Sequence, residues 1–264
     1  MTGHVTTPAA ALAERLPEWA TLVRAANPGP MTLEGTNTWV LRATPGAPAV
    51  VVDPGPLDEG HLRAVAGHGP IGAVLATHGH PDHVEGVARF AEITGARLFR
   101  DVTEIEAAGL GISAVATPGH TADSVCYLVE GGAGERAVFT GDTILGRGTT
   151  VIARPDGDLG DYLASLALLE AYPGCLVLPG HGPALADCAV AARFYLAHRQ
   201  ARLEQVRRAV ADGAKTAEEV VATVYADVDR SLWAAAEWSV RAQLAYLGLP
   251  AGESRRGSQR LDRP

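Results

Sequence analysis

The sequence has few cysteines and no long apolar run. Its three cysteines, Cys126, Cys175 and Cys188, form no Cys-x-x-Cys pair. An odd number without that spacing argues against a disulfide framework and favours buried thiols in a reducing compartment. No stretch approaches the roughly 18 apolar residues of a membrane span, and no basic segment leads into an apolar run at the N-terminus. We therefore expect no membrane helix and no secretion signal, and predict a cytoplasmic location.

Positive charge is also scarce. Lysine and arginine number 22 against 30 aspartates and glutamates, the formal net charge is −8, and Lys215 is the only lysine. Such a chain lacks the overall positive field that attracts nucleic acid, although a local basic patch could still bind it. Apolar residues, by contrast, make up 47% of the 264 residues. This is enough for one large domain, or for one domain with a small appendage.

The first 190 residues or so alternate between short apolar runs and segments of helical periodicity, with turn signals between them. The strands that we expect cover residues 21–25, 36–43, 48–52, 71–77, 97–100, 112–116, 124–129, 136–140 and 175–179. The expected helices cover residues 58–67, 84–94 and 159–171. The segment 131–135, Gly-Gly-Ala-Gly-Glu, predicts a hairpin between two of these strands.

The remainder of the chain has a helical pattern. One long helix or two joined helices are expected over 184–211, and a further helix over 231–247. Between them, Thr216 and Glu219 have the spacing of a capping box that opens another helix. We therefore divide the chain into a first domain at 1–192 and a small helical domain at 193–264, which ends in a polar tail.

The strongest chemical signal is the segment His78-Gly-His80-Pro-Asp82-His83, which directly follows an apolar strand. Four potential metal ligands lie within six residues, and imidazole and carboxylate groups suit zinc or iron. In a loop that leaves a strand, His78 and His80 can reach one metal ion while Asp82 and His83 reach another. A solvated polar loop would explain a single histidine, but it is a weak explanation for this cluster.

Three further polar residues follow predicted strands: His120 in Thr-Pro-Gly-His, Asp142 in Gly-Asp-Thr and His181 in Pro-Gly-His-Gly. Each of these short segments alone is typical of a turn. Together they place two histidines and a carboxylate where a sheet presents ligands at one edge. The sequence therefore predicts a site that combines them with the 78–83 cluster.

The order of these motifs resembles the metallo-β-lactamase superfamily over roughly residues 20–190. The resemblance implies an α/β (α+β) fold, a four-layer αββα sandwich with the metals at one edge. It also implies two zinc ions, with iron or manganese as alternatives, and a metal-bridging hydroxide as nucleophile. The implied ligands of the first metal are His78, His80 and His120, those of the second are Asp82, His83 and His181, and Asp142 bridges both. Asp53 matches a position that supports the ligand loop. Asp82 matches the catalytic position, whose carboxylate orients the hydroxide.

Within the superfamily, residues 27–43 and 141–166 resemble the β-lactamase-like protein 2 group. That group ends in a small winged-helix-like domain, and some of its members cleave single-stranded RNA. The metal motifs also resemble glyoxalase II. His80 stands where diiron oxygen-reducing relatives have a carboxylate, which favours hydrolysis over redox chemistry.

These observations predict a dinuclear zinc hydrolase that acts on a small ester or thioester. Cleavage of single-stranded RNA is one alternative, and a non-catalytic module that binds nucleic acid or a partner is another. Four residues lie in segments expected to line the mouth of the site: Asn37, Arg147, Thr149 and Thr150. A homodimer is possible, and nothing in the sequence specifies its interface.

Overall fold

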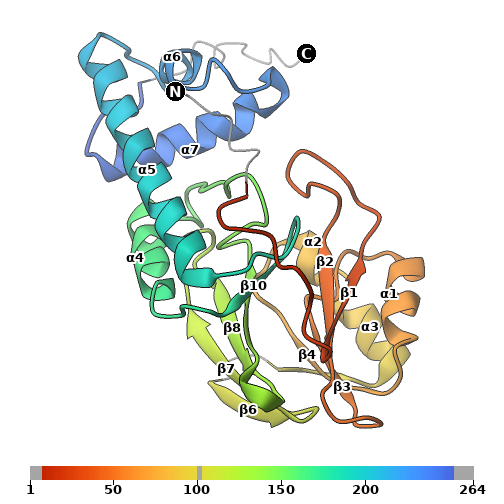
Figure 1. Cartoon of the computed structure of the whole chain (residues 1–264). Helices are drawn as coiled ribbons and strands as arrows, with labels where there is room; N and C mark the ends of the chain where they lie inside the picture. Colours follow the sequence, from red (N-terminus) through yellow and green to blue (C-terminus); the bar gives the residue numbers. More distant parts are fainter. Residues whose placement is uncertain (1–7, 100–102, 253–264) are drawn as a thin grey trace, which may run out of the picture.

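The computed structural model describes residues 8–99 and 103–252, and its strands form two five-stranded sheets (Figure 1). The first sheet has the order β1 (Ala20–Arg24), β2 (Asn37–Leu41), β3 (Ala49–Val52), β4 (Ile71–Leu75), β5 (Arg97–Phe99). The second has the order β10 (Leu176–Pro179), β9 (Arg136–Gly141), β8 (Val125–Glu130), β7 (Leu110–Ala116), β6 (Glu104–Ala107). Both sheets are mixed, because β3–β4, β4–β5 and β9–β10 pair in parallel and the other neighbours are antiparallel.

The helices form the outer layers. Helices α1 (Glu59–Ala66), α2 (Pro81–Val84) and α3 (Val87–Thr94) lie beside the first sheet, and α4 (Leu159–Leu169) and α5 (Cys188–Ala211) beside the second (Figure 1). Strand β3 shows why this order is stable. Val50 and Val52 pack in the core between the sheets, whereas Val51 packs in the core under α1 and α3. A strand buried on both faces needs apolar side chains at every position, so the fold is the expected αββα sandwich.

A separate small core holds the C-terminal helices together. Valine and alanine side chains from α5, α6 (Ala217–Val224) and α7 (Trp233–Tyr246) form this core, which includes Val206, Val221 and Val240. The Thr216 hydroxyl caps α6 by accepting a hydrogen bond from Glu219 N, as the capping-box spacing predicts. Helix α5 runs without interruption through residue 192, so the division at 192/193 remains a prediction.

Some local features differ from the expected elements. The helix predicted over 84–94 is α3, which begins only at Val87, and the short helix α2 before it was not expected. The long C-terminal helix, expected from residue 184, begins at Cys188, where Asp187 caps it. Strand β6 was not expected, because its side chains are only half-buried at a sheet edge. The hairpin between β8 and β9 is present and contains a short 3-10 helix, η1 (Gly132–Gly134). The polar tail beyond Gly252 lies outside the described residues.

The three cysteines are free and buried, as the sequence predicts. None of the helices in the described part of the chain combines the length and the apolarity that a bilayer span requires.

Candidate metal centre

All seven predicted ligands gather at one edge of the sandwich. They come from the segments that follow four strands: β4, β7, β9 and β10. The site consists of three overlapping groups, namely His78, His80 and His120; His78, His83 and Asp142; and Asp82, His83 and His181. Residues separated by more than 100 positions thus meet in one cluster, although the ligand roles themselves remain a prediction.

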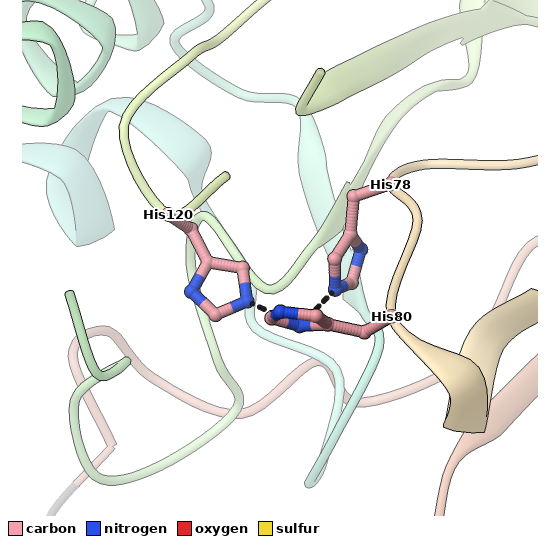
Figure 2. Close-up of side chains that lie close together, drawn as sticks. All are labelled: His78, His80 and His120. Carbon is pink, nitrogen blue, oxygen red and sulfur yellow. Dashed lines mark hydrogen bonds between the residues drawn. The ribbon is translucent and has the colours of Figure 1, made fainter. Parts of the chain in front are cut away.

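The first group contains three histidines whose ring nitrogens converge. His80 Nδ1 lies 3.0 Å from His78 Nε2 and 3.0 Å from His120 Nε2. Figure 2 shows the three rings turned toward one another, with His80 between the other two. A single nitrogen cannot make a good linear hydrogen bond to both neighbours at once, so this arrangement is better suited to three lone pairs that face one cation.

The third group, Asp82, His83 and His181, contains two histidines and a carboxylate. His83 Nε2 and His181 Nε2 are 3.3 Å apart, and Asp82 Oδ2 lies 3.4 Å from the first and 3.2 Å from the second. A tetrahedral ion with ligand bonds of about 2.0–2.1 Å places its ligand atoms about 3.3 Å apart. The spacing of these three atoms therefore fits a zinc-sized ion.

Asp142 lies between the group of three histidines and the group that contains Asp82. Its Oδ1 is 3.5 Å from His83 Nε2 and 3.4 Å from His181 Nε2, while its Oδ2 is 3.7 Å from His120 Nε2. Asp142 Oδ1 is buried and has no hydrogen-bond partner among the described residues. A buried carboxylate oxygen without a partner is costly, and a cation would satisfy it. The donor set and this atom fit two divalent ions with Asp142 between them.

Asp53 fixes the orientation of the ligand segment. It ends β3 with a φ of +52°, in a region that non-glycine residues seldom occupy. Its Oδ2 accepts a hydrogen bond from His83 Nδ1 at 2.8 Å, and its two oxygens accept from Thr77 N and Thr77 Oγ1, both at 2.7 Å. Since His83 Nδ1 carries a proton, His83 Nε2 presents its lone pair to the centre.

Similar contacts set the tautomers of two more histidines. His120 Nδ1 donates to Val151 O at 2.9 Å, which leaves Nε2 as the inward-facing nitrogen. The Thr77 hydroxyl donates to Asp53, so it accepts from His78 Nδ1 at 3.0 Å, and His78 Nε2 faces inward. The two rings are therefore set up as ligands by groups that do not themselves reach the centre.

The electrostatics of the centre favour a bound cation. Burial, reinforced by the neighbouring His83, lowers the pKa of His78 to about 2 and keeps its ring neutral. Burial also acts to lower the pKa of His181, but Asp142 and Asp82 outweigh it and raise that pKa to about 9. The pKa of Asp82 lies below its usual range, since its contacts with His181 and His83 outweigh the burial that raises it. The carboxylates thus attract positive charge at neutral pH.

A cavity of about 310 Å³ opens on His120 and Asp142. Three of the residues expected at the mouth line it, namely Arg147, Thr149 and Thr150. Thr150 Oγ1 also lies 3.2 Å from His120 Nδ1.

The fourth residue expected at the mouth, Asn37, does not line this cavity. It is fully buried, and its side-chain amide donates to Pro179 O at 3.0 Å and to Gly182 O at 2.9 Å. Asn37 instead holds the turn that carries His181. The sequence places Asn37 near a turn but does not show which way its side chain points.

The cavity also contains residues that the sequence did not single out. Its other wall comes from α5, α7 and the segment between α6 and α7, and it includes Arg199 and Arg202. Near the centre, the Thr36 hydroxyl donates to Asp82 Oδ2 at 3.0 Å. Arginines on a helix carry no recognisable motif, so only the folded chain shows that these two face the cavity.

Comparison with known proteins identifies the fold and the family. A model of the metallo-beta-lactamase superfamily matches residues 31–109 and 97–181, a span that contains all seven predicted ligands. The chain belongs to the metallo-β-lactamase superfamily. Membership makes it a metal-dependent hydrolase, so the alternative of a non-catalytic binding module is not supported. A second model, of the beta-lactamase associated winged helix domain, matches residues 216–247.

Curated relatives agree with this superfamily assignment. A beta-lactamase-like protein 2 homolog from Caenorhabditis elegans is 31% identical over 254 residues, which cover 86% of this chain and 81% of the relative. An atrochrysone carboxyl ACP thioesterase from Aspergillus fumigatus is 32% identical over 236 residues, covering 75% of this chain and 71% of the relative. The resemblance to the β-lactamase-like protein 2 group is therefore confirmed.

The fold also matches a solved structure. A beta-lactamase domain protein from Burkholderia ambifaria aligns with a TM-score of 0.70 at 23% identity, over 92% of this chain and 89% of that protein. At this identity the match supports the fold, including the C-terminal domain that the alignment spans.

Proposed function

We propose that this metallo-β-lactamase family member is a dinuclear zinc hydrolase that cleaves a small thioester or ester. The observation that carries the proposal is the cavity of about 310 Å³ that opens directly on His120 and Asp142. Apolar side chains such as Leu33, Leu145 and Val151 line part of it. A concave, partly apolar space beside a metal centre suits an acyl group whose carbonyl points at the ions.

The chain supplies the ligands and the proton acceptor. His78, His80 and His120 would hold one ion, Asp82, His83 and His181 the other, and Asp142 both. When bound, two such ions activate water at neutral pH and polarise the scissile carbonyl. The Asp82 side chain keeps 27% of its surface exposed and is deprotonated at neutral pH, so it can orient the attacking water and accept its proton.

Two observations favour a thioester over RNA. The Aspergillus fumigatus relative is named as a thioesterase, and all seven candidate ligands come together in this chain. A single strand of RNA requires a basic track with stacking platforms, whereas this chain has a formal net charge of −8. The homodimer and the cytoplasmic location remain predictions.

The test compares substrates on protein of known metal content. Zinc per chain is measured by inductively coupled plasma spectrometry, and hydrolysis of acetyl and butyryl thioesters is measured beside cleavage of a fluorescent single-stranded RNA. We expect about two zinc ions per chain and thioester hydrolysis. RNA cleavage without thioester hydrolysis would overturn the proposed substrate.

The matched variants are His80→Ala and His68→Ala. His80 belongs to the first histidine group, whereas His68 is exposed and belongs to no group of potential ligands found among the described residues. We expect His80→Ala to lose zinc and at least about 100-fold in kcat/KM, because one ion is left with only two histidines and the shared Asp142. His68→Ala should match the parent. A His80→Ala variant that kept both ions and full activity would overturn the ligand assignment.

A further inference from the structure

Two arginines of α5 face the cavity that adjoins the metal centre. Arg199 and Arg202 are three residues apart on the helix, which places them on the same face. The same cavity is bounded by His120 and Asp142. Two guanidinium groups therefore share one enclosed space with the proposed site of hydrolysis.

Arg199 is a buried cation with no counterion in the part of the chain that the structure describes. Its residue is 4% exposed, one terminal nitrogen donates to Thr150 O, and its Cζ lies 5.1 Å from the centroid of the Tyr162 ring. Its Nε is buried and has no hydrogen-bond partner among the described residues. No carboxylate of that part of the chain lies within 4.0 Å of its guanidinium. A buried charge without a partner is strongly unfavourable unless a ligand supplies the opposite charge.

Arg202 extends the same positive surface. Its Nη1 donates to Val224 O at 2.6 Å and to Gln205 Oε1 at 3.0 Å, and its Cζ lies 4.4 Å from the centroid of the Tyr225 ring. Like Arg199, Arg202 forms no ion pair with any carboxylate of residues 8–99 and 103–252. The stem and one end of each guanidinium are thus held in place, while other N–H groups remain for a ligand.

Other charges at the cavity do not neutralise this pair. Arg147 makes an ion pair with Glu34, so it has its own counterion. Asp227 lines the cavity but lies beyond ion-pair distance of both arginines. The positive charge of Arg199 and Arg202 is therefore available to a molecule that enters the cavity.

We propose that Arg199 and Arg202 form a subsite for an anionic group of the substrate, either a carboxylate on the acyl part or a phosphate on the thiol carrier. This inference rests on the proposed thioester hydrolysis. Guanidinium groups present planar sets of N–H donors that match both carboxylate and phosphate oxygens. The subsite holds one end of the substrate while the metal centre receives the scissile carbonyl, and this orients the bond to be cleaved.

The experiment compares three thioesters on the zinc-loaded protein. Acetyl-N-acetylcysteamine has no anionic group, succinyl-N-acetylcysteamine has a carboxylate on the acyl part, and acetyl-phosphopantetheine has a phosphate on the thiol. We expect at least one of the anionic thioesters to have a KM about tenfold below that of the neutral one. The thioester with the lower KM identifies the source of the anion. Equal KM values for all three would overturn the subsite.

Variants connect this preference to the two arginines. In Arg199→Gln and Arg202→Gln we expect the KM of the preferred anionic thioester to come within about threefold of the KM of the neutral one, both measured on the same variant. The control is Arg207→Gln on the same helix, whose side chain is 59% exposed and pairs only weakly with Glu204 at 3.9 Å. A preference that survived both cavity substitutions would also overturn the proposal. Since Arg202 is less buried than Arg199, its variant remains informative if Arg199→Gln does not fold.

A binding measurement separates this inference from the proposed function. If no thioester is hydrolysed, the proposed function fails, and thermal unfolding is then measured with succinate, inorganic phosphate and succinamide. A rise in Tm with an anion but not with succinamide, lost in Arg202→Gln and kept in Arg207→Gln, supports the subsite alone. No rise in the parent protein overturns it.

Discussion

Asp53 determines the orientation of two candidate ligands although it does not reach the centre itself. It holds His83 directly and His78 through the Thr77 hydroxyl. The backbone at Asp53 has an unfavourable positive φ, which persists because three hydrogen bonds over-determine the side chain. We therefore predict that Asp53 raises metal affinity by limiting the rotation of the two rings.

Replacement of Asp53 tests this role. Asp53→Asn exchanges one acceptor oxygen for an NH₂ group, which only donates, so at least one of the hydrogen bonds from Thr77 and His83 is lost. We expect zinc affinity to fall about 10- to 100-fold, as is typical when a group that orients a metal-binding histidine is changed. Competition with a chromophoric chelator measures this affinity. Asp161→Asn, at an exposed position on α4, is the control and should bind zinc as the parent does. Unchanged affinity in Asp53→Asn would contradict the role.

At the scale of elements, α5 connects the catalytic sandwich to the C-terminal helices. Tyr195 on this helix is fully buried, and its hydroxyl accepts from Leu145 N at 3.0 Å and contacts Gly148 O at 2.9 Å. Leu145 and Gly148 both line the cavity. One hydroxyl thus ties the helix to the loop that forms the cavity wall.

Tyr195→Phe removes this tie and leaves the Leu145 amide and the Gly148 carbonyl without a partner. We expect the free energy of unfolding to fall by about 1–3 kcal/mol, the cost of leaving buried polar groups unsatisfied. Urea unfolding followed by circular dichroism measures it. Tyr246, on α7, is 50% exposed, so Tyr246→Phe should change stability by less than about 0.5 kcal/mol. An equal loss of stability in the two variants would show that the Tyr195 hydroxyl does not stabilise the contact between α5 and this loop.

At the scale of the whole molecule, stability depends on pH through histidines that the fold keeps neutral. His198 lines the cavity, and burial together with Arg199 and Arg202 lowers its pKa to about 4. The folded state then binds fewer protons than the unfolded state below the ordinary histidine pKa of about 6.5. This contribution is complete above pH 6.5 and is lost as the pH falls from 6.5 towards 4.

His198→Gln removes this contribution without adding a charge. We expect the free energy of unfolding of the variant to fall less steeply between pH 6.5 and 4.5 than that of the parent, by roughly 1 kcal/mol over the range. Denaturant unfolding at a series of pH values measures the two slopes. His68→Gln, at an exposed position, should keep the parent's slope. A steeper fall in the free energy of unfolding in His198→Gln than in the parent would contradict a lowered pKa of His198 in the folded state.

The sequence predicts the site better than the cavity, for a physical reason. His78 to His83 are close in the sequence, and His120, Asp142 and His181 each follow a strand, so local rules bring them to one edge. The layers also follow from local pattern, since the consecutive valines of β3 point alternately into the core between the sheets and the core under the helices. Arg199 reaches the cavity only because α5 packs against α4 and the segment that carries Thr150, and no short-range pattern encodes that contact.

The candidate ligands and one wall of the cavity also come from different parts of the chain. All the candidate ligands precede Gly182, whereas the arginine-bearing wall begins at His198. The candidate ligands and this one wall thus come from successive stretches of the chain, whereas the opposite wall, with Leu33, Leu145 and Arg147, belongs to the first stretch. A single genetic crossover near Pro183 would keep the candidate ligands and replace the side of the cavity that contains Arg199 and Arg202. Recombination of this kind would change the substrate of the enzyme without passing through a form that has lost its candidate metal ligands.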